Sequence, residues 1–244
     1  LAVTGDLASA DAADPELYDP PLEGAVTSFQ DRHGLEPDGL VGRRTLAALN
    51  VGMQARIDQI RVNLERMRWV AQDLKGDYLL VDIAGFHARL TLDGREVWSS
   101  RVVVGQPYRS TPVFRATMRT IVLDPTWNVP PTILDEDILP KLARDPGMLA
   151  RDHMKVLDRA GNEVDPATVD WAQYAGRTPP YQIVQAPGDG NPLGRLKFMF
   201  PNGHDVYLHD TPARELFDKS ERAFSSGCIR VQHPLTLALL LLDD

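Results

Sequence analysis

The sequence has little cysteine, no long apolar run and no cluster of positive charge. Its one cysteine, Cys228, excludes an internal disulfide and any zinc site built from several cysteines. The longest uncharged, mostly apolar stretch, residues 235–242, is far shorter than the roughly 18 residues that a membrane-spanning helix needs. Acidic residues outnumber basic ones by 34 to 26, and the resulting formal net charge of −8 argues against a nucleic-acid partner.

What the sequence does contain is typical of a globular protein, with 43% hydrophobic and 25% charged residues in a length of 244. That length fits one large domain or two modest ones. The chain opens on Leu1 instead of Met and stops directly after an apolar run. We therefore expect both ends to have been cut from a longer protein, so that the lack of a leader or anchor is uninformative.

The N-terminal third carries helical patterns. Residues 1–21 are rich in Ala, Asp and Pro and have no period, whereas short helices are expected on either side of a turn at residues 36–39. We predict that residues 1–50 form a small, partial helical module. Residues 51–76 are predicted to form a linking amphipathic helix, whose apolar stripe is expected to pack on the next domain. That stripe consists of Ile57, Ile60, Leu64, Met67 and Ala71.

The pattern changes to short β-rich runs beyond residue 76, which predicts a mostly antiparallel sheet in an α+β domain spanning residues 77–244. Residues 132–190 interrupt these runs with helical and loop patterns. An interruption of that length is more often a functional lid or insertion than a plain connection. A final helix is expected from Pro234. The expected strands cover residues 78–83, 88–92, 97–98, 101–104, 117–123, 181–185, 196–200 and 205–208.

The only cysteine follows a turn formed by Ser225, Ser226 and Gly227. A glycine just before a nucleophile lets the backbone bend sharply and aim successive N–H groups at one point. Such a turn could stabilise a Cys228 thiolate and later the oxyanion of an acyl-transfer intermediate. Arg230 adds positive charge to the same region.

A cysteine nucleophile also needs a base, and His209 fits that role best. In an extended segment Tyr207 and His209 share one face, while Leu208 and Asp210 point the other way. Leu208 can then enter the core while His209 faces a cleft. Because Asp210 points away, we expect a backbone carbonyl or a hydroxyl to hold the other ring nitrogen of His209.

Two other interpretations of these residues stay open at this point. A free cysteine is usually an inert small hydrophobe, and a lone histidine at a strand end is usually an ordinary surface or hydrogen-bonded residue. A zinc site is a further alternative, but the spacing does not match the usual ligand patterns and no fourth-ligand pattern stands out. Its ligands would be His204, His209, Cys228 and His233.

The segment SSGCIR at residues 225–230, following HDT at residues 209–211, resembles the catalytic signature of the L,D-transpeptidases of the YkuD type. Two positions depart from the common pattern. Asp210 stands where many members have Gly, and Ser226 where many have His. Both departures resemble the larger YcbB-like branch of that family.

The resemblance covers residues 78–244 and extends upstream. Residues 132–190 are similar to the capping subdomain of the YcbB-like branch, and residues 29–45 resemble part of a peptidoglycan-binding helical module with its first helix shortened or missing. The family implies a catalytic β-sandwich fold with this helical and loop insertion. Further matching segments are residues 101–105, 109–112, 128–131, 194–198 and 200–202.

The resemblance implies a reaction on the peptide stems of bacterial peptidoglycan. The Cys228 thiolate would attack the bond between the third residue and D-alanine, with His209 as base. N–H groups near Ser226, Gly227 and Cys228 would hold the oxyanion, and Arg230 would assist. A side-chain amine of a second stem would then resolve the thioester into a third-to-third cross-link. The same resemblance implies substrate contacts for Trp127, Ser225, Asn202 and Tyr207.

Several wider expectations follow from the family. Donor and acceptor stems are the expected partners, carbapenems the expected covalent inhibitors, and no metal or organic cofactor is required. The expected location is the bacterial periplasm, with a role in cell-wall organisation and cell shape and an anchor or export signal outside this chain. A cell-wall cysteine carboxypeptidase, which only hydrolyses stems, and a non-catalytic wall-binding protein with an inert Cys228 remain as alternatives. The insertion is expected to shelter the thioester from water.

Overall fold

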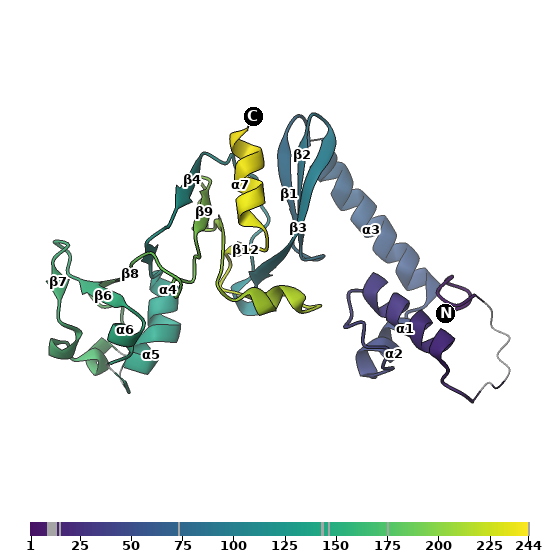
Figure 1. The fold of residues 1–244 in the computed structure, drawn as a ribbon, viewed down its shortest axis with the longest axis horizontal. Helices are drawn as coiled ribbons and strands as arrows, with labels where there is room; N and C mark the ends of the chain where they lie inside the picture. The colour runs from purple at the N-terminus through teal and green to yellow at the C-terminus, as the bar shows by residue number, and fades with distance from the viewer. Residues whose placement is uncertain are drawn as a thin grey trace. The chain divides into compact units, whose positions relative to one another are not determined.

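The computed structural model describes residues 1–8, 14, 16–72, 74–142, 144–145, 147–174 and 176–243. The chain divides into two compact units, which are described separately. The first comprises residues 1–99 and 218–222, and the second comprises residues 100–217 and 223–244. The elements of both are labelled in Figure 1.

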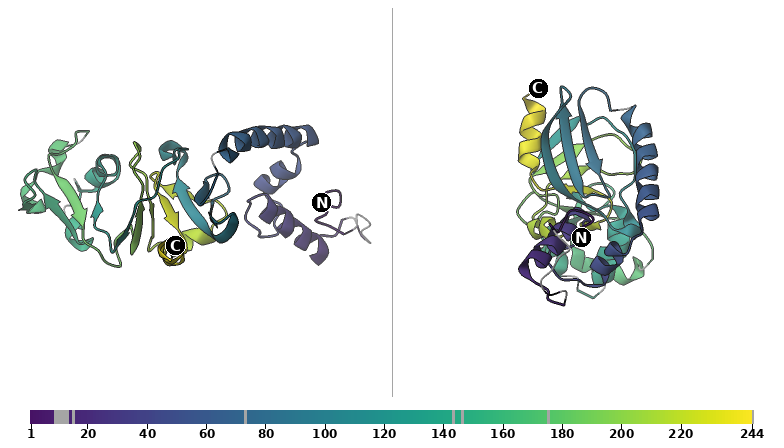
Figure 2. Two further views of the ribbon diagram at one scale, coloured as in Figure 1. Left: turned by 90° about the horizontal axis from the view of Figure 1, so that it is seen from above. Right: turned by 90° about the vertical axis from the view of Figure 1, so that its right-hand side faces the viewer.

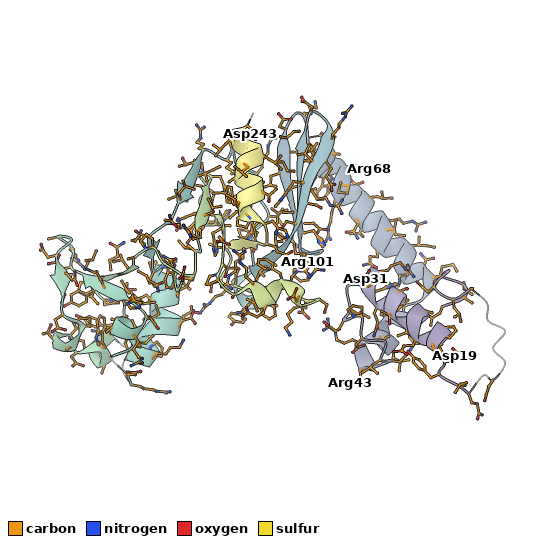
Figure 3. The ribbon with its side chains drawn as sticks, in the orientation of Figure 1. Asp19, Asp31, Arg43, Arg68, Arg101 and Asp243 are labelled. Carbon is orange, nitrogen blue, oxygen red and sulfur yellow. The ribbon has the colours of Figure 1, made fainter. Side chains whose placement is uncertain are left out.

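The first unit begins with a helical module. Asp19 starts α1 because its carboxylate accepts a hydrogen bond from the Leu22 N–H at 3.0 Å, and prolines occupy the first helical positions. Asp19 is labelled in Figure 3. The amide of Gln30 is buried and bonds both to the Gly39 N–H and to the Thr45 hydroxyl, which fastens the turn between two helices. The helices are α1 (Pro20–Arg32), α2 (Arg43–Leu49) and α3 (Met53–Ala71).

The long helix α3 differs from the sequence prediction. Its helical span agrees, but none of its residues is buried, so the expected packing of its apolar stripe is not seen. Trp69 is 68% exposed. Arg68, labelled in Figure 3, pairs with Glu65 at 2.9 Å on the same helix. Among the described residues, no helix is both long and apolar enough to cross a membrane.

A β-hairpin completes the first unit. Strands β1 (Tyr78–Asp82) and β2 (His87–Leu92) pair antiparallel, and β2 is followed by the beginning of β3 (Arg95–Gly105). Ala88 and Leu90 alternate with exposed or half-buried residues and are buried, as expected for a strand with one face in a core.

The second unit holds a sheet with the strand order β3-β12-β10-β9-β4, with β11 beside β3. The β10–β12 and β11–β3 pairs are parallel and the other pairs are antiparallel. One face of the sheet buries Phe198, Leu208, Ile229 and Val231. The elements are η1 (Pro107–Arg109), β4 (Thr120–Leu123), β9 (Leu196–Met199), β10 (Leu208–His209), η5 (Arg214–Asp218), β11 (Ala223–Ser225), β12 (Ile229–Val231) and α7 (Pro234–Leu242).

The predicted insertion of helices and loops contains a sheet as well. Its four strands are antiparallel, in the order β5-β8-β6-β7. Figure 1 shows β6 and β8 beside the helices of the insertion, and Figure 2 shows the same part of the chain from two other sides. Its own core includes Leu142, Leu149, Val156 and Ile183, all fully buried. The elements are β5 (Trp127–Asn128), α4 (Pro131–Ile133), η2 (Leu134–Ile138), α5 (Leu139–Leu142), α6 (Met148–Arg151), β6 (Met154–Leu157), β7 (Glu163–Val164), η3 (Pro166–Thr168), η4 (Trp171–Tyr174) and β8 (Gln182–Gln185).

The prediction of an α+β fold with a mostly antiparallel sheet is confirmed. Two strand predictions were wrong in detail. The strand expected at residues 205–208 begins only at Leu208, because Asp205 adopts a left-handed backbone with φ of 54° that interrupts extended structure. The strand at residues 181–185 forms as β8, but it belongs to the sheet of the insertion instead of the main sheet.

Candidate active site

The register of three short strands places the polar residues of the site on one face of the main sheet. Lys197 pairs with His209 across β9 and β10, and His209 pairs with Arg230 across β10 and β12. Paired residues in adjacent strands project to the same face, so these three side chains form a row. Leu208, which alternates with His209, is buried on the opposite face as predicted.

Tyr207 and Cys228 lie directly before the two paired strands. The Ile229 N–H donates to the Tyr207 carbonyl at 3.0 Å, which holds the two segments together. The rings of Tyr207 and His209 lie 5.7 Å apart, so they share a face as the sequence predicted. The backbone N–H and the phenol hydroxyl of Tyr207 lie close enough to the Cys228 sulfur to lower the pKa of the thiol, against the effect of burial. The structure therefore brings Cys228, Tyr207, His209 and Arg230 together.

The turn before Cys228 is held by a serine that the sequence assigned to substrate binding. Ser225 is buried, and its hydroxyl donates to the Cys228 carbonyl at 2.5 Å and accepts from the Gly227 N–H at 3.1 Å. Ser225 therefore shapes the turn and does not face substrate. Because the Gly227 N–H is already bonded, it is not available to an oxyanion, and that part of the prediction was wrong. The glycine is needed instead for its left-handed backbone, with φ of 113°.

The end of β3 and the residues that follow it also hold this turn in place. The Thr111 hydroxyl donates to the Gly227 carbonyl at 2.8 Å and accepts from the Gly105 N–H at 2.9 Å. The Gln106 N–H donates to the Ser225 carbonyl at 2.9 Å. A Cβ atom at Gly105 would overlap the backbone of this segment, which explains the glycine there. The end of β3 and the residues after it thus fix the nucleophile turn through the backbone.

His209 is held in one tautomer. Its Nδ1 lies 2.5 Å from the Asp210 carbonyl, and because a carbonyl only accepts, Nδ1 carries the proton and Nε2 is left with a lone pair. Of the two partners predicted for this ring nitrogen, a backbone carbonyl or a hydroxyl, the structure shows the carbonyl. Burial, reinforced by the positive charges of Arg230 and Lys197, lowers the pKa of His209 to about 3. The imidazole is therefore neutral near pH 7, as a general base must be.

The side chain of Asp210 points away from His209 and has a separate structural role. Its carboxylate accepts from the Arg195 N–H at 2.9 Å and pairs with Arg214 at 2.5 Å. A Cβ atom at Gly194 would overlap this carboxylate. Asp210 thus occupies the space beside a glycine at the start of β9, which explains how an aspartate is accommodated where a glycine is common in the family.

Cys228 rests as a thiol. Burial raises its pKa, even though the hydrogen bonds from Tyr207 and the charges of Lys197 and Arg230 act in the opposite direction. The sulfur contacts the Asp205 carbonyl at 3.8 Å. The expectation of a preformed thiolate is not supported. A neutral thiol and a neutral imidazole on the same face of the sheet require the proton to move as the sulfur attacks.

Lys197 was missed as a site residue by the sequence reasoning. It is half-buried, and its ammonium lies 3.7 Å from the centre of the Tyr207 ring. The only signal in the sequence is a lysine between the buried residues Leu196 and Phe198 of a predicted strand. That alternation places Lys197 on the second face of the sheet, but only the strand register shows that His209 lies opposite.

Ser226 connects the nucleophile turn to the insertion. It is exposed, and its hydroxyl accepts a hydrogen bond from Arg109 at 2.9 Å. The same guanidinium bonds to Asp137 at 2.6 Å and to Glu136 at 2.5 Å, both in η2 of the insertion. The Arg109 side chain is only 14% exposed, and these carboxylates raise its pKa further above its usual value. One side chain therefore joins the insertion to the residue two positions before Cys228.

Two residues that were predicted to contact substrate, Asn202 and Trp127, have other contacts in the structure. Asn202 uses its amide to donate to the Phe200 and Val206 carbonyls and its oxygen to accept from the His204 and Val206 N–H groups. With both hydrogens and both lone pairs used, it braces a loop and has nothing left for substrate. Trp127 packs against the core of the insertion and lines an open hollow of about 400 Å³ there, not with Cys228.

The described part of the chain contains no group of three or more His, Cys, Asp or Glu side chains placed to hold a metal ion. The residues of the zinc alternative have other surroundings: His204 packs against Phe114, and His209 is bonded to a carbonyl. The reactive groups are therefore a thiol, an imidazole, a phenol and two cations. Such a set suits acyl transfer through a covalent thioester.

Comparisons with known proteins agree with this chemistry. A family model described as the L,D-transpeptidase catalytic domain (YkuD) matches residues 76–243. A second model, described as "Putative peptidoglycan binding domain", matches residues 5–49. A Haemophilus influenzae protein named "Putative L,D-transpeptidase" is 38% identical over 186 residues, which cover 76% of this chain. The chain spans 37% of that protein's length.

A solved structure titled "Structure of the Ldtfm-avibactam carbamoyl enzyme" matches with a TM-score of 0.38 and 14% identity, covering 69% of this chain and 46% of that one. A likeness of this size carries no argument about residues. The family match extends over the whole of the site, from Lys197 to Arg230, and includes the insertion. The chain belongs to the L,D-transpeptidase family of the YkuD type, with an N-terminal peptidoglycan-binding domain.

Proposed function

We propose that this protein is a peptidoglycan L,D-transpeptidase that forms third-to-third cross-links, with Cys228 as nucleophile and His209 as base. The observation that carries the proposal is the fixed His209 tautomer: its Nδ1 proton is held by the Asp210 carbonyl, on the face of the sheet that also holds Cys228. A base locked in this way has its free Nε2 available for the thiol proton. The family match supports the same assignment.

The first half of the reaction forms the thioester. The Cys228 sulfur attacks the carbonyl that joins the third residue of a donor stem to D-alanine, while its proton passes to Nε2 of His209. The tetrahedral oxyanion is bound by the Tyr207 N–H, which already points at the sulfur, and by the Cys228 N–H, which has no acceptor among the described residues. Each such donor typically contributes on the order of 3 kcal/mol to the transition state. His209 then protonates the leaving nitrogen, and D-alanine departs.

The second half transfers the acyl group. A side-chain amine of a second stem attacks the thioester carbonyl and loses a proton to His209, and the collapse of the intermediate returns the proton to the sulfur. The product is an amide between the third residues of two stems, and Cys228 is again a thiol. The protein and the two stems supply every atom and proton that the two half-reactions transfer.

The insertion is proposed to shelter the thioester from water, so that an amine and not water accepts the acyl group. The contact that supports this role is the hydrogen bond from Arg109 to Ser226, since the same side chain binds Glu136 and Asp137 of the insertion. Deletion of the insertion, residues 132–190, is expected to raise the ratio of hydrolysis to cross-linking. An unchanged ratio in a folded deletion variant would contradict the sheltering role.

A carboxypeptidase that only hydrolyses stems would use the same residues and differ in the acceptor. Incubation with tetrapeptide stems separates the two reactions, because a transpeptidase yields stem dimers and a carboxypeptidase yields free tripeptide. We expect dimers. The peptidoglycan-binding domain at residues 5–49 supports a wall substrate, and with it we propose a location in the bacterial periplasm and a role in cell-wall organisation.

Intact-mass measurement after treatment with a carbapenem tests the central claim. We expect one covalent adduct on the wild type and none on Cys228→Ala. Absence of an adduct on the folded wild type, or an adduct that survives Cys228→Ala, would overturn the assignment of Cys228. Simple thiol alkylation is a poorer test, because burial raises the pKa of Cys228 and slows its reaction near pH 7 whether or not it is a nucleophile.

A further inference from the structure

We propose that Lys197 is a substrate-binding residue that pairs with a carboxylate of the donor stem beside the bond that Cys228 attacks. This inference rests on the proposed function for the identity of the donor. The proposed ionic contact with Lys197 would determine which donor stems the enzyme accepts. The ligand chemistry is a carboxylate on or next to the residue at the scissile bond.

The first support is the position of Lys197 in the sheet. It lies opposite His209 in the β9–β10 register, and its ammonium sits 3.7 Å from the centre of the Tyr207 ring. Tyr207 in turn lies close enough to the Cys228 sulfur to act on the pKa of the thiol. The charge is therefore one aromatic ring away from the nucleophile, on the face where the scissile bond must lie.

The second support is the missing counter-charge. Lys197 forms no ion pair with any residue that the structure describes, although it is half-buried. Asp124, directly after the adjoining strand β4, is already paired with the neighbouring Arg195 at 2.8 Å. A half-buried cation without an acid is costly in the free protein, and a bound carboxylate would remove that cost.

The third support is a second cation on the same face of the sheet, which also lacks a partner for one of its polar atoms. Arg230 lies across β10 from Lys197, and its buried Nε has no hydrogen-bond partner among the described residues. Two cations on one face, neither of them in an ion pair among the described residues, create a field that attracts anions. The stabilisation of a resting thiolate does not account for both cations, because Cys228 remains a thiol in their presence.

Donor stems offer two carboxylates near the scissile bond. One belongs to the departing D-alanine, and the other belongs to the diamino acid on the acyl side. Both present the same anionic oxygens, so three synthetic donors distinguish them: the free acid, a donor with a C-terminal D-alaninamide, and a donor with the carboxylate of the third residue converted to a carboxamide.

Binding of these donors is best measured by calorimetry on Cys228→Ala, since no reaction then takes place. We expect the free acid to bind about tenfold more tightly than one of the two amides, and the weaker amide identifies the carboxylate. Cys228→Ala combined with Lys197→Met is expected to lose this preference, and Cys228→Ala combined with Lys197→Arg to keep most of it. A thermal melt of each variant shows that it is folded.

Equal affinity of the free acid and both amides for Cys228→Ala would overturn the proposal. So would a preference that Lys197→Met leaves intact. If Lys197→Met leaves binding unchanged but shifts the pH profile of Cys228 alkylation, the lysine acts on the sulfur and the proposal is wrong. A wild type that binds the free acid in the expected way but forms neither a carbapenem adduct nor a stem dimer would contradict the proposed function alone.

Discussion

Two regions of the second unit border the nucleophile turn, and each is held in place by a different kind of interaction. The row of Lys197, His209 and Arg230 is fixed by the hydrogen-bond register of β9, β10 and β12. The insertion folds around its own core and sheet, and Arg109 bonds it to the nucleophile turn through charged side chains. The chemistry thus depends on backbone pairing, whereas the bonds of Arg109 depend on ionic contacts that a single substitution can remove.

The two regions also differ in what a small structural change would disrupt. A shift of one residue in β10 would send His209 to the opposite face of the sheet and bring Leu208 beside Cys228. In contrast, breaking the contacts of Arg109 with Glu136 and Asp137 would leave both sheets intact. We therefore expect substitutions in the strand row to change the rate of the chemical step, and those at Arg109 to change the fate of the thioester.

The largest effect is expected for His209→Gln. Loss of a general base typically lowers the rate by 10²- to 10⁴-fold, and the neutral His209 imidazole is the base assigned to the Cys228 thiol. The rate of carbapenem acylation, followed by intact mass, measures this loss. At high pH, where the thiol ionises without help, the difference from the wild type should shrink. A variant that acylates at the wild-type rate near pH 7 would show that His209 is not the base.

The next effect is expected for Leu142→Ala in the core of the insertion. Leu142 is fully buried, and truncation of such a leucine typically costs 2–5 kcal/mol. Hydrogen exchange should show faster exchange of amides in β6 and β8, while those in β9, β10 and β12 remain protected. Leu235→Ala, at a residue that is 62% exposed, is the matched control and should change neither region. Equal loss of protection in both sheets would show that they fold as one.

A smaller effect concerns acid stability. His209 has a pKa of about 3 when folded and about 6.5 when unfolded, so the unfolded chain binds more protons between these values. The free energy of unfolding must therefore fall as the pH drops below 6.5, by about 2 kcal/mol from this group at pH 5. His209→Gln removes that contribution. Denaturant titrations at pH 7 and 5 should show a smaller loss of stability for the variant than for the wild type.

The smallest effect is expected for Arg109→Met. Loss of its bonds to Ser226, Glu136 and Asp137 should leave carbapenem acylation nearly unchanged and raise the share of hydrolysis by about tenfold, or about 1.4 kcal/mol. The measurement is the ratio of tripeptide to dimer. Arg109→Lys keeps the charge but not the forked geometry and should lie between the two. If Arg109→Met gives the same ratio of tripeptide to dimer as the wild type, the contacts of Arg109 with the insertion do not control whether water or an amine accepts the acyl group.

The sequence predicted the parts of the site that depend on local pattern. The alternation of Tyr207, Leu208 and His209 was enough to place the histidine on the functional face and to expect a carbonyl on its second nitrogen. It was not enough for Lys197, because that assignment depends on which strands are neighbours. Strand order follows from long-range pairing, and no local pattern encodes it.

The errors have a common physical origin. Ser225 and Asn202 were assigned to substrate from the family resemblance. In the structure their hydrogen-bonding groups are used by the backbone of tight turns. A sequence shows that such groups exist, but it does not show whether the local backbone already satisfies them. The same holds for the sheet of the insertion, whose short strands are stabilised by a core that sequence spacing alone did not reveal.

The contact between Asp210 and Gly194 has a consequence for comparing or redesigning these enzymes. A side chain at residue 194 and a carboxylate at residue 210 would compete for the same volume. An aspartate grafted into a relative with glycine at the equivalent of residue 210 would therefore require glycine at the equivalent of residue 194. The left-handed backbone of Gly194, with φ of 59°, favours glycine there for a second reason. The two positions thus constrain each other, although they lie in different segments of the chain.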